Sequence, residues 1–176
     1  MDSLKALVDE FAQFARMPAP KAVPTDLNAV LTDTLALYRG LFREITLEPR
    51  LADALPLVRI DAEQIRRVII NLIDNAVEAL GGAGAGPRPD GRAPAIDIAT
   101  AHDRGNGVVR ITVTDNGPGI PPEDREKLFM PYYSTKRRGS GLGLAIVRRI
   151  IAEHGGAIDA ADNSPSGTVF TIELPC

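Results

Sequence analysis

Two glycine-rich turns, about twenty residues apart, constrain this chain more than any other feature of its sequence. The first reads Asp-Asn-Gly-Pro-Gly-Ile from Asp115, and the second reads Gly-Ser-Gly-Leu-Gly-Leu-Ala-Ile and ends at Ile146. Glycine adopts positive φ and lets the backbone approach a ligand closely, so paired glycine turns predict a phosphate or nucleotide site. The segment between them has little apolar periodicity and is long enough to act as a lid.

The composition predicts one domain of ordinary size. Of the 176 residues, 44% are apolar, which is enough for a core, and the formal charge of −3 gives no reason to expect nucleic acid as a partner. The one cysteine, Cys176, excludes an internal disulfide and suits a reducing compartment. No apolar run reaches the length of a membrane span, and no signal-peptide pattern is present. We therefore expect a cytoplasmic α/β domain; any membrane anchor would belong to another part of the protein.

The N-terminal segment predicts an amphipathic helix that needs a partner. Its apolar residues recur at helical spacing on one face, at Leu4, Leu7, Val8, Phe11, Phe14 and Ala15. Pro18 and Pro20 end this helix, and the residues up to Pro24 predict a stiff connector. The apolar stripe either packs on its own domain or is the tail of a longer dimerisation helix that begins upstream. We expect a helical stub over 1–17, a linker over 18–24 and one folded domain over 25–176.

The remaining elements alternate between helices and strands. The periodicity predicts a helix from Thr25 or Asp26 to Arg39, strands at 45–47 and 57–60, a helix over 61–80, strands at 96–100 and 108–114, a helix over 142–154, and a hairpin of 157–161 with 168–174. The glycine-rich residues 81–95 predict a flexible loop. This order favours a two-layer α/β sandwich with a mixed sheet over a doubly wound parallel sheet.

The helix predicted over 61–80 has two contrasting faces. Its apolar arc holds Ile65, Ile69, Leu72, Ile73, Ala76, Val77 and Leu80, and its polar arc holds Asn71, Asp74, Asn75 and Glu78. Asn and Asp are poor helix formers, so a plain solvated face would more often use Glu, Lys or Gln. Two asparagines at i and i+4 align two amide oxygens, which suits a hard cation or a water network. A solvated face is the alternative; the glycine turns elsewhere favour the cation.

Two common nucleotide motifs are absent. The chain has no Gly-x-x-x-x-Gly-Lys-Ser/Thr, and the dinucleotide fingerprint fails because its third glycine would fall at Leu144 or Ile146. A helix N-terminus near Leu142 is the remaining phosphate cradle, where the backbone N–H groups of Gly141, Leu142 and Gly143 and the helix dipole favour an anion. Ser140 can add a hydroxyl donor. The basic residues Lys136, Arg137 and Arg138 either neutralise phosphate or form a solvated cluster.

Asp115 is a candidate for selecting the base. A carboxylate accepts hydrogen bonds from an adenine amine and repels a guanine carbonyl, so Asp115 on the rim of a pocket would favour ATP over GTP. The alternative is an aspartate that caps a turn, which is common before Asn-Gly. Asn75 is a candidate ligand of the Mg²⁺ that bridges the phosphates.

Four segments resemble the conserved boxes of one family. Asn-Leu-Ile-Asp-Asn-Ala-Val-Glu-Ala from Asn71, Asp-Asn-Gly-Pro-Gly-Ile, Leu-Phe-Met-Pro-Tyr-Tyr-Ser-Thr-Lys and Gly-Ser-Gly-Leu-Gly-Leu-Ala-Ile are similar to the N, G1, F and G2 boxes of sensor histidine kinases. Those boxes belong to the ATP-binding domain of the Bergerat (GHKL) fold, a two-layer sandwich with the sheet on one side and the helices on the other. The resemblance covers 25–176. The first helix resembles the end of the dimerisation domain in nitrogen-regulation kinases of the NtrY type.

The resemblance implies a set of site residues. It places Asn71 and Asn75 over the triphosphate with Asn75 on Mg²⁺, Asp115 on the adenine amine, and Thr168 behind the adenine through water. Asp74 matches the acidic position before the second Asn, which the resemblance makes a candidate for proton handling. The full set expected to bind ATP is Asn71, Asn75, Glu78, Asp115, Gly117, Gly119, Ile120, Tyr133, Lys136, Ser140, Gly141, Leu142, Gly143, Leu144 and Thr168, of which Tyr133 and Lys136 belong to the lid.

One expected residue is missing. The family transfers the γ-phosphoryl of ATP to a histidine followed by an acidic residue, and the two histidines here, His102 and His154, both lie outside the first helix. The resemblance therefore implies a kinase fragment that binds Mg·ATP and phosphorylates a histidine on a separate dimerisation domain, with a response regulator as the next partner and a possible homodimer through the N-terminal helix. Two alternatives stay open: a GHKL serine kinase of the anti-sigma type, and a non-catalytic nucleotide-binding regulatory module.

Overall fold

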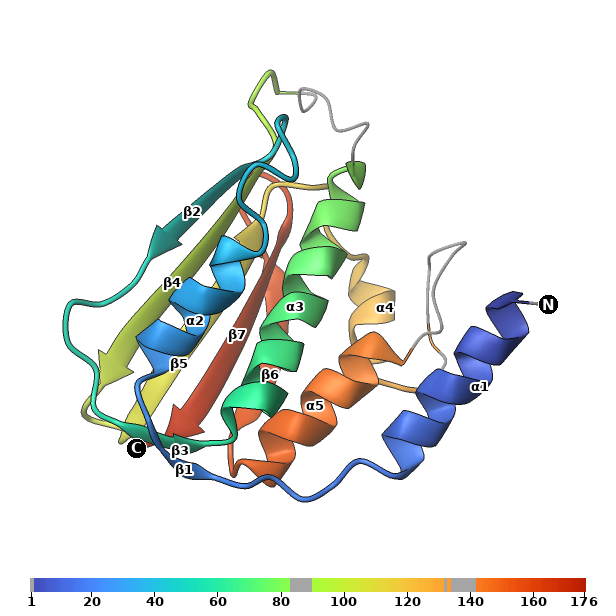
Figure 1. Cartoon of the computed structure of the whole chain (residues 1–176). Helices are drawn as coiled ribbons and strands as arrows, with labels where there is room; N and C mark the ends of the chain where they lie inside the picture. Colours follow the sequence, from blue (N-terminus) through green and yellow to red (C-terminus); the bar gives the residue numbers. More distant parts are fainter. Residues whose placement is uncertain (1, 83–89, 132, 134–141) are drawn as a thin grey trace.

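The computed structural model has two layers, with helices covering one face of a mixed sheet (Figure 1). It describes residues 2–82, 90–131, 133 and 142–176. The strands are β1 (Val23–Thr25), β2 (Thr46–Arg50), β3 (Val58–Ile60), β4 (Ala95–Asp103), β5 (Val108–Asp115), β6 (Ala157–Asp162) and β7 (Thr168–Pro175). The helices are α1 (Asp2–Ala15), α2 (Leu27–Ala36), α3 (Ala62–Ala79), α4 (Pro122–Arg125) and α5 (Gly143–Glu153). The predicted two-layer sandwich is confirmed.

The main sheet has the strand order β2-β4-β5-β7-β6. The β2–β4 pair is parallel, and the other three pairs are antiparallel. In Figure 1, α2, α3 and α5 lie side by side in front of this sheet, with α3 between the other two. The sheet buries its apolar face by packing these helices against it, which is why one face of each of them is apolar.

The central strands place polar residues at one end of a buried apolar row. Along β5, Val109, Ile111 and Val113 face the helices, and the next inward position is Asp115. Along β7 the row begins with Thr168, the residue paired with Asp115 in the β5–β7 register. Because alternate residues of a strand share a face, the inner surface ends in a buried carboxylate beside a buried hydroxyl.

Asp61 fixes the start of α3. Its carboxylate accepts hydrogen bonds from the backbone N–H groups of Glu63 at 3.1 Å and Gln64 at 3.3 Å, and from that of Lys21 at 3.0 Å. The backbone N–H of Asp61 donates to Nε2 of His154 at 3.0 Å, which joins the start of α3 to the end of α5. Burial opposes ionisation of Asp61, but the three backbone donors outweigh it and hold its pKa below the usual value.

Replacing Asp61 with Ala is expected to destabilise the domain by about 1 kcal/mol at neutral pH, since an N-cap and a tie to the linker are lost. A lowered folded-state pKa adds stability above the unfolded pKa of about 3.9 and loses it as the pH falls through the folded value. The Asp61→Ala deficit should therefore shrink in acid. Asp61→Asn, which keeps an acceptor without the charge, is the matched control. Urea unfolding at pH 7 and pH 3 measures both, and a deficit that does not change with pH would contradict the charge argument.

The N-terminal helix packs on the domain at one end. Phe14 is partly buried against the core, and the Arg149 guanidinium lies over its ring at 5.3 Å while Arg149 Nη1 donates to the Phe14 carbonyl. Towards the N-terminus, Leu4, Val8 and Phe11 are 63, 56 and 47% exposed. Figure 1 shows α1 beside α5 and away from the sheet. Part of the apolar stripe thus packs on its own domain, and part of it faces outward.

Three local features differ from the sequence-based expectation. Val23–Thr25 forms β1 and pairs with β3, where the sequence predicted the end of the connector at Pro24 and a possible helix cap at Thr25. The strand predicted at 45–47 begins one residue later, continues to Arg50 and pairs in parallel with β4. The short helix α4 was not predicted, because four residues leave no periodicity to detect. Tertiary pairing, and not local propensity, creates β1.

Candidate functional site

A cavity of about 220 Å³ lies between α3, the ends of β5 and β7, and the first glycine turn. Its lining residues are Asn75, Ala76, Ala79, Asp115, Pro118, Gly119, Ile120, Pro121, Leu128, Leu144, Thr168 and Phe170. The walls are mostly apolar, with a few polar groups from α3, β5 and β7, which is the usual make-up of a ligand site. Its volume lies slightly below the ~300 Å³ at which such sites usually begin, so it suits one small ring system.

Asp115 is held in place from several directions. It is 5% exposed, and its Oδ1 accepts a hydrogen bond from the backbone N–H of Gly117 at 2.8 Å. Its carbonyl accepts from Nδ2 of Asn163 at 3.0 Å. A Cβ on Gly117 would lie 3.0 Å from Asp115 Oδ1 and 3.3 Å from the Ala79 carbonyl, so glycine lets the turn pack closely between the carboxylate and the end of α3. The turn fixes the direction of a buried carboxylate that can accept further hydrogen bonds.

Asn116 is a positioning residue that the sequence reasoning missed. Its side chain is buried, Oδ1 accepts from the backbone N–H of Ala95 at 2.9 Å, and Nδ2 donates to the Ala93 carbonyl at 2.8 Å. Both bonds tie the end of β5 to the start of β4. In the sequence, the only indication was the Asn of Asp-Asn-Gly. An Asn there is as typical of a turn as of a side chain that joins two strands, so its role was missed.

The polar face of α3 lies next to the start of α5. Asn75 lines the cavity, and Asn71, one turn earlier, has its Oδ1 3.5 Å from where a Cβ on Gly143 would stand. The two asparagines therefore lie along one line from the cavity to the N-terminus of α5, as the i, i+4 spacing predicts. Glu78 is exposed and does not line the cavity.

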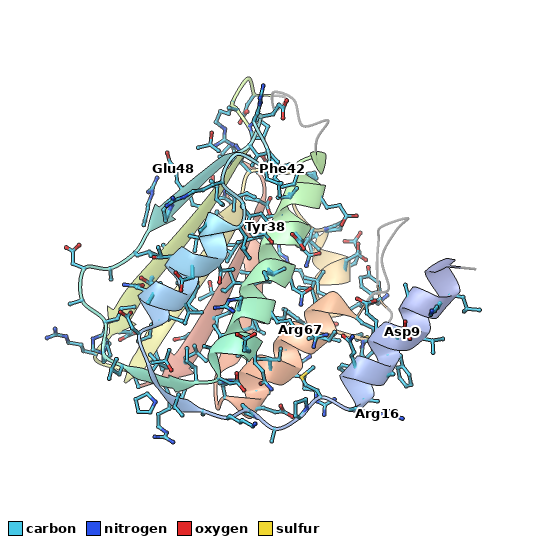
Figure 2. The ribbon with its side chains drawn as sticks, in the orientation of Figure 1. Asp9, Arg16, Tyr38, Phe42, Glu48 and Arg67 are labelled. Carbon is cyan, nitrogen blue, oxygen red and sulfur yellow. The ribbon has the colours of Figure 1, made fainter. Side chains whose placement is uncertain are left out.

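Asp74 is engaged by a neighbouring helix. The Tyr38 hydroxyl donates to Asp74 Oδ1 at 2.8 Å, and burial followed by this bond raises the pKa of Tyr38 above its usual value. Figure 2 labels Tyr38 near the C-terminal end of α2. Asp74 therefore links α3 to the end of α2, a contact that nothing in the sequence predicted.

The N-terminus of α5 has the features expected of an anion site. Leu142 is its N-cap and makes no side-chain cap to the backbone, and the Leu142 side chain is fully buried in the core. Leu142 and Gly143 can therefore meet a ligand through their backbone, whereas the Leu144 side chain lines the cavity. The backbone N–H groups at the start of a helix point out of it, and together with the helix dipole they favour a phosphate here.

The residues between the two turns are described in part. The Tyr133 hydroxyl donates a hydrogen bond to the carboxylate of Asp124 in α4, which raises the pKa of Tyr133. Tyr133 is not among the lining residues of the cavity. The predicted contacts of Lys136, Ser140 and Gly141 fall on residues outside the described ranges.

Neither histidine is presented as a phosphoacceptor. His154 Nδ1 lies 2.7 Å from the carbonyl of Ile150 in its own helix, and its Nε2 accepts from the backbone N–H of Asp61, so both ring nitrogens are engaged. His102 belongs to β4, with its Nε2 3.6 Å from Cys176 Sγ. Within the part of the chain that the structure describes, no helix is long and apolar enough to cross a bilayer.

The two-layer fold with a cavity at the ends of its central strands is the architecture of an ATP-binding domain, and a comparison with protein-family models agrees. A model described as "Histidine kinase-, DNA gyrase B-, and HSP90-like ATPase" matches residues 60–176. The chain therefore belongs to this ATPase family, and its fold is that of a histidine kinase catalytic domain.

Two curated relatives are similar over nearly the whole chain. The sensor histidine kinase ZraS of Klebsiella oxytoca is 36% identical over 176 residues, which is 99% of this chain and 36% of that protein. The nitrogen regulation protein NtrY of Azorhizobium caulinodans is 36% identical over 168 residues, which is 96% of this chain and 21% of that protein. The chain thus spans about a third or less of these relatives. Equal identity to both does not single out the NtrY type.

Three solved structures share the fold. The catalytic domain of histidine kinase ThkA, nucleotide-free, is 34% identical with a TM-score of 0.74, covering 88% of this chain and 95% of that one. Full-length ShkA in complex with AMPPNP is 29% identical with a TM-score of 0.81, covering 99% and 36%. ThkA in complex with the response regulator protein TrrA is 30% identical with a TM-score of 0.78, covering 98% and 47%.

Proposed function

We propose that this chain is the part of a sensor histidine kinase that binds Mg·ATP and transfers its γ-phosphoryl to a histidine on a separate dimerisation domain. The observation that carries the proposal is the meeting of three elements at one cavity: the buried Asp115 at the end of β5, Asn75 on α3, and the N-terminus of α5. The complex of the similar protein ShkA with AMPPNP supports an adenine nucleotide as the ligand.

Each part of the site would contribute a different interaction. Asp115 would accept a hydrogen bond from the adenine amine, and the apolar walls with Gly119, Ile120 and Thr168 would enclose the base. The N–H groups at the start of α5 would bind phosphate oxygens. Such a site accelerates phosphoryl transfer mainly by positioning the groups and neutralising charge, and the acceptor histidine would supply the attacking imidazole nitrogen.

The donor set on α3 suits magnesium. Mg²⁺ prefers oxygen ligands and is usually held by few protein groups together with substrate phosphates. Asn75 and Asn71 offer amide oxygens along one line of α3, so Asn75 would ligate the ion with Asn71 beside it. When bound, the ion would neutralise charge on the phosphates.

Asn75→Ala is expected to weaken Mg·ATP binding at least tenfold and metal-free ATP by less than threefold, since one ion ligand is lost and the adenine contacts remain. Calorimetry with Mg²⁺ and with a chelator measures both. Glu63→Ala, at an exposed position in the first turn of the same helix, is the control and should leave both titrations unchanged. Equal losses for Asn75→Ala in both titrations would show that Asn75 does not ligate Mg²⁺.

The reaction itself is tested by adding the protein and labelled ATP to a dimerisation-domain protein that carries the acceptor histidine. Acid-labile label on that histidine, absent when the histidine is replaced by Gln, is the expected result. Acid-stable label on serine or threonine would instead support a serine kinase. If the chain binds ATP but transfers no label to the acceptor protein, a regulatory module would be supported.

The partners follow from the same proposal. A response regulator would take the phosphoryl group from the histidine, as the ThkA–TrrA complex of a similar kinase suggests. The exposed part of α1 would pair with the remainder of a dimerisation domain or with a second copy of this chain, and the whole would act in the cytoplasm, where ATP is available. Mass measurements over a range of concentrations are expected to detect dimers, and to lose them in Val8→Glu; a monomer at all concentrations would contradict pairing through α1 alone.

A further inference from the structure

A second cavity, of about 290 Å³, lies on the other side of α2 from the nucleotide site, between α2 and β2. It is lined by Thr32, Leu35, Tyr38, Arg39, Gly40, Phe42, Ile45, Leu47, Pro49 and Leu51. None of these residues lines the nucleotide cavity. In Figure 2, Tyr38 and Phe42 lie near the C-terminal end of α2. This cavity is larger than the nucleotide cavity and has no part in the proposed reaction.

The alternation of β2 makes the floor of this cavity apolar. Leu47 and Pro49 face α2, and their neighbours on the strand face away. On that outer face Arg50 pairs with Glu48 at 3.6 Å and with Asp97 at 3.8 Å, so these charges do not reach the cavity. The acidic residues are therefore absent from the lining, which holds one charged residue, Arg39.

The polar side chains of the lining are engaged, except for Arg39. Thr32 donates to the Asn28 carbonyl at 2.8 Å, and Tyr38 donates to Asp74. Arg39 is exposed, and among the residues that the structure describes no carboxylate lies within ion-pair distance of its guanidinium. An apolar cavity with a lone guanidinium at its mouth matches an amphipathic anion, with the apolar part inside and the carboxylate on Arg39.

We propose that the cavity between α2 and β2 binds a small carboxylic acid with an apolar chain or ring. Its volume equals that of about ten water molecules at ~30 Å³ each, which sets the ligand at about ten non-hydrogen atoms. Octanoate has this size and this chemistry. The Arg39 guanidinium can donate two parallel hydrogen bonds to a carboxylate, so charge and shape select the acid over the neutral alcohol of the same length.

Tyr38 connects this cavity to α3. Its ring lines the cavity, and its hydroxyl binds Asp74, the residue before Asn75. A ligand packed against the ring changes the surroundings of that bond, and with it the position of the helix that carries Asn75. In this second role, which rests on the proposed nucleotide function, the acid would modulate nucleotide affinity by about fivefold or more.

Binding of octanoate is tested without nucleotide, by calorimetry and by NMR amide shifts, so its outcome does not depend on the proposed function. The expected result is saturable binding, with amide shifts at 32–51, weakened at least tenfold by Arg39→Gln and abolished by Leu47→Trp, which fills the cavity. Arg43→Gln and Leu57→Trp are matched controls at exposed positions outside the lining and should not change it. Circular dichroism checks that each variant is folded.

No saturable binding, or binding that Leu47→Trp leaves intact, would overturn the site. Equal affinity for octanol and octanoate, or no effect of Arg39→Gln, would overturn the assignment of the carboxylate to Arg39. The coupling is tested by repeating nucleotide titrations with saturating octanoate in the parent protein and in Tyr38→Phe, which keeps the ring and loses the bond. A fivefold change confined to the parent protein is expected; the same nucleotide affinity with and without octanoate in the parent would overturn the coupling.

Discussion

Replacing Asp115 with Ala is expected to weaken ATP binding by about 10- to 100-fold. A hydrogen bond between a neutral donor and a buried carboxylate contributes up to ~3 kcal/mol, and each 1.4 kcal/mol is a factor of ten in affinity. Asp115 is 5% exposed, so its carboxylate is largely shielded from water in the folded protein. Calorimetry with ATP measures the loss of affinity. Retained affinity would show that Asp115 does not bind the adenine.

Asp115→Asn separates the charge from the shape. An Asn oxygen can still accept from the Gly117 N–H, so the turn should keep its conformation, while the new NH₂ group can donate to a guanine carbonyl. The ratio of ATP to GTP affinity should therefore fall at least tenfold in this variant. Asp97→Asn, at a carboxylate on the outer face of the sheet, is the control and should leave the ratio unchanged. An unchanged ratio in Asp115→Asn would mean that another group selects the base.

Gly167→Ala is expected to be the most destabilising single substitution considered, by about 3–5 kcal/mol or to the point of not folding. Gly167 has φ of +113°, and a Cβ there would overlap the Asp115 carbonyl oxygen and lie 2.9 Å from Asn116 Cα. The strand end that carries Asp115 would have to move, so any folded fraction should also bind ATP more weakly. Urea unfolding measures the loss of stability.

Gly107→Ala is the matched control for Gly167→Ala. Gly107 also has positive φ, +65°, but an added Cβ would meet nothing within 4 Å. Backbone strain alone should then cost about 1 kcal/mol. Equal destabilisation by the two substitutions would show that φ, and not the contact with Asp115, makes Gly167 necessary.

Much of the fold could be predicted because it depends on local periodicity. The apolar arc of α3 packs against the sheet as its 3.6-residue spacing predicts, and Asp61 caps it. The alternation in β5 and β7 predicted strands with one buried face. The parallel pairing of β2 with β4 and the pairing of β1 with β3 were not predictable, because both depend on contacts between segments distant along the chain.

The sequence predicted individual residues of the candidate site, but not how they come together in space. Asp115, Asn75 and Leu144 line one cavity, and Thr168 lies opposite Asp115 in the register. Glu78 and Tyr133 were also expected at the nucleotide; they do not line the cavity, and their contact with a nucleotide stays a prediction. The hydrogen bond between the Asn116 side chain and the backbone of β4 became visible only in the tertiary structure.

The sequence by itself determined the two glycine turns, the divided faces of α3 and the absence of an acceptor histidine on the first helix, because each is a matter of residue type and spacing. The tertiary structure decided that Asp115, Thr168 and Asn75 meet at one cavity, that Tyr38 bonds Asp74, and that a second cavity opens beside Arg39. Spacing fixes which residues share a face of one element. Which faces meet is set by strand register and by packing between elements, and that information is spread over the whole chain.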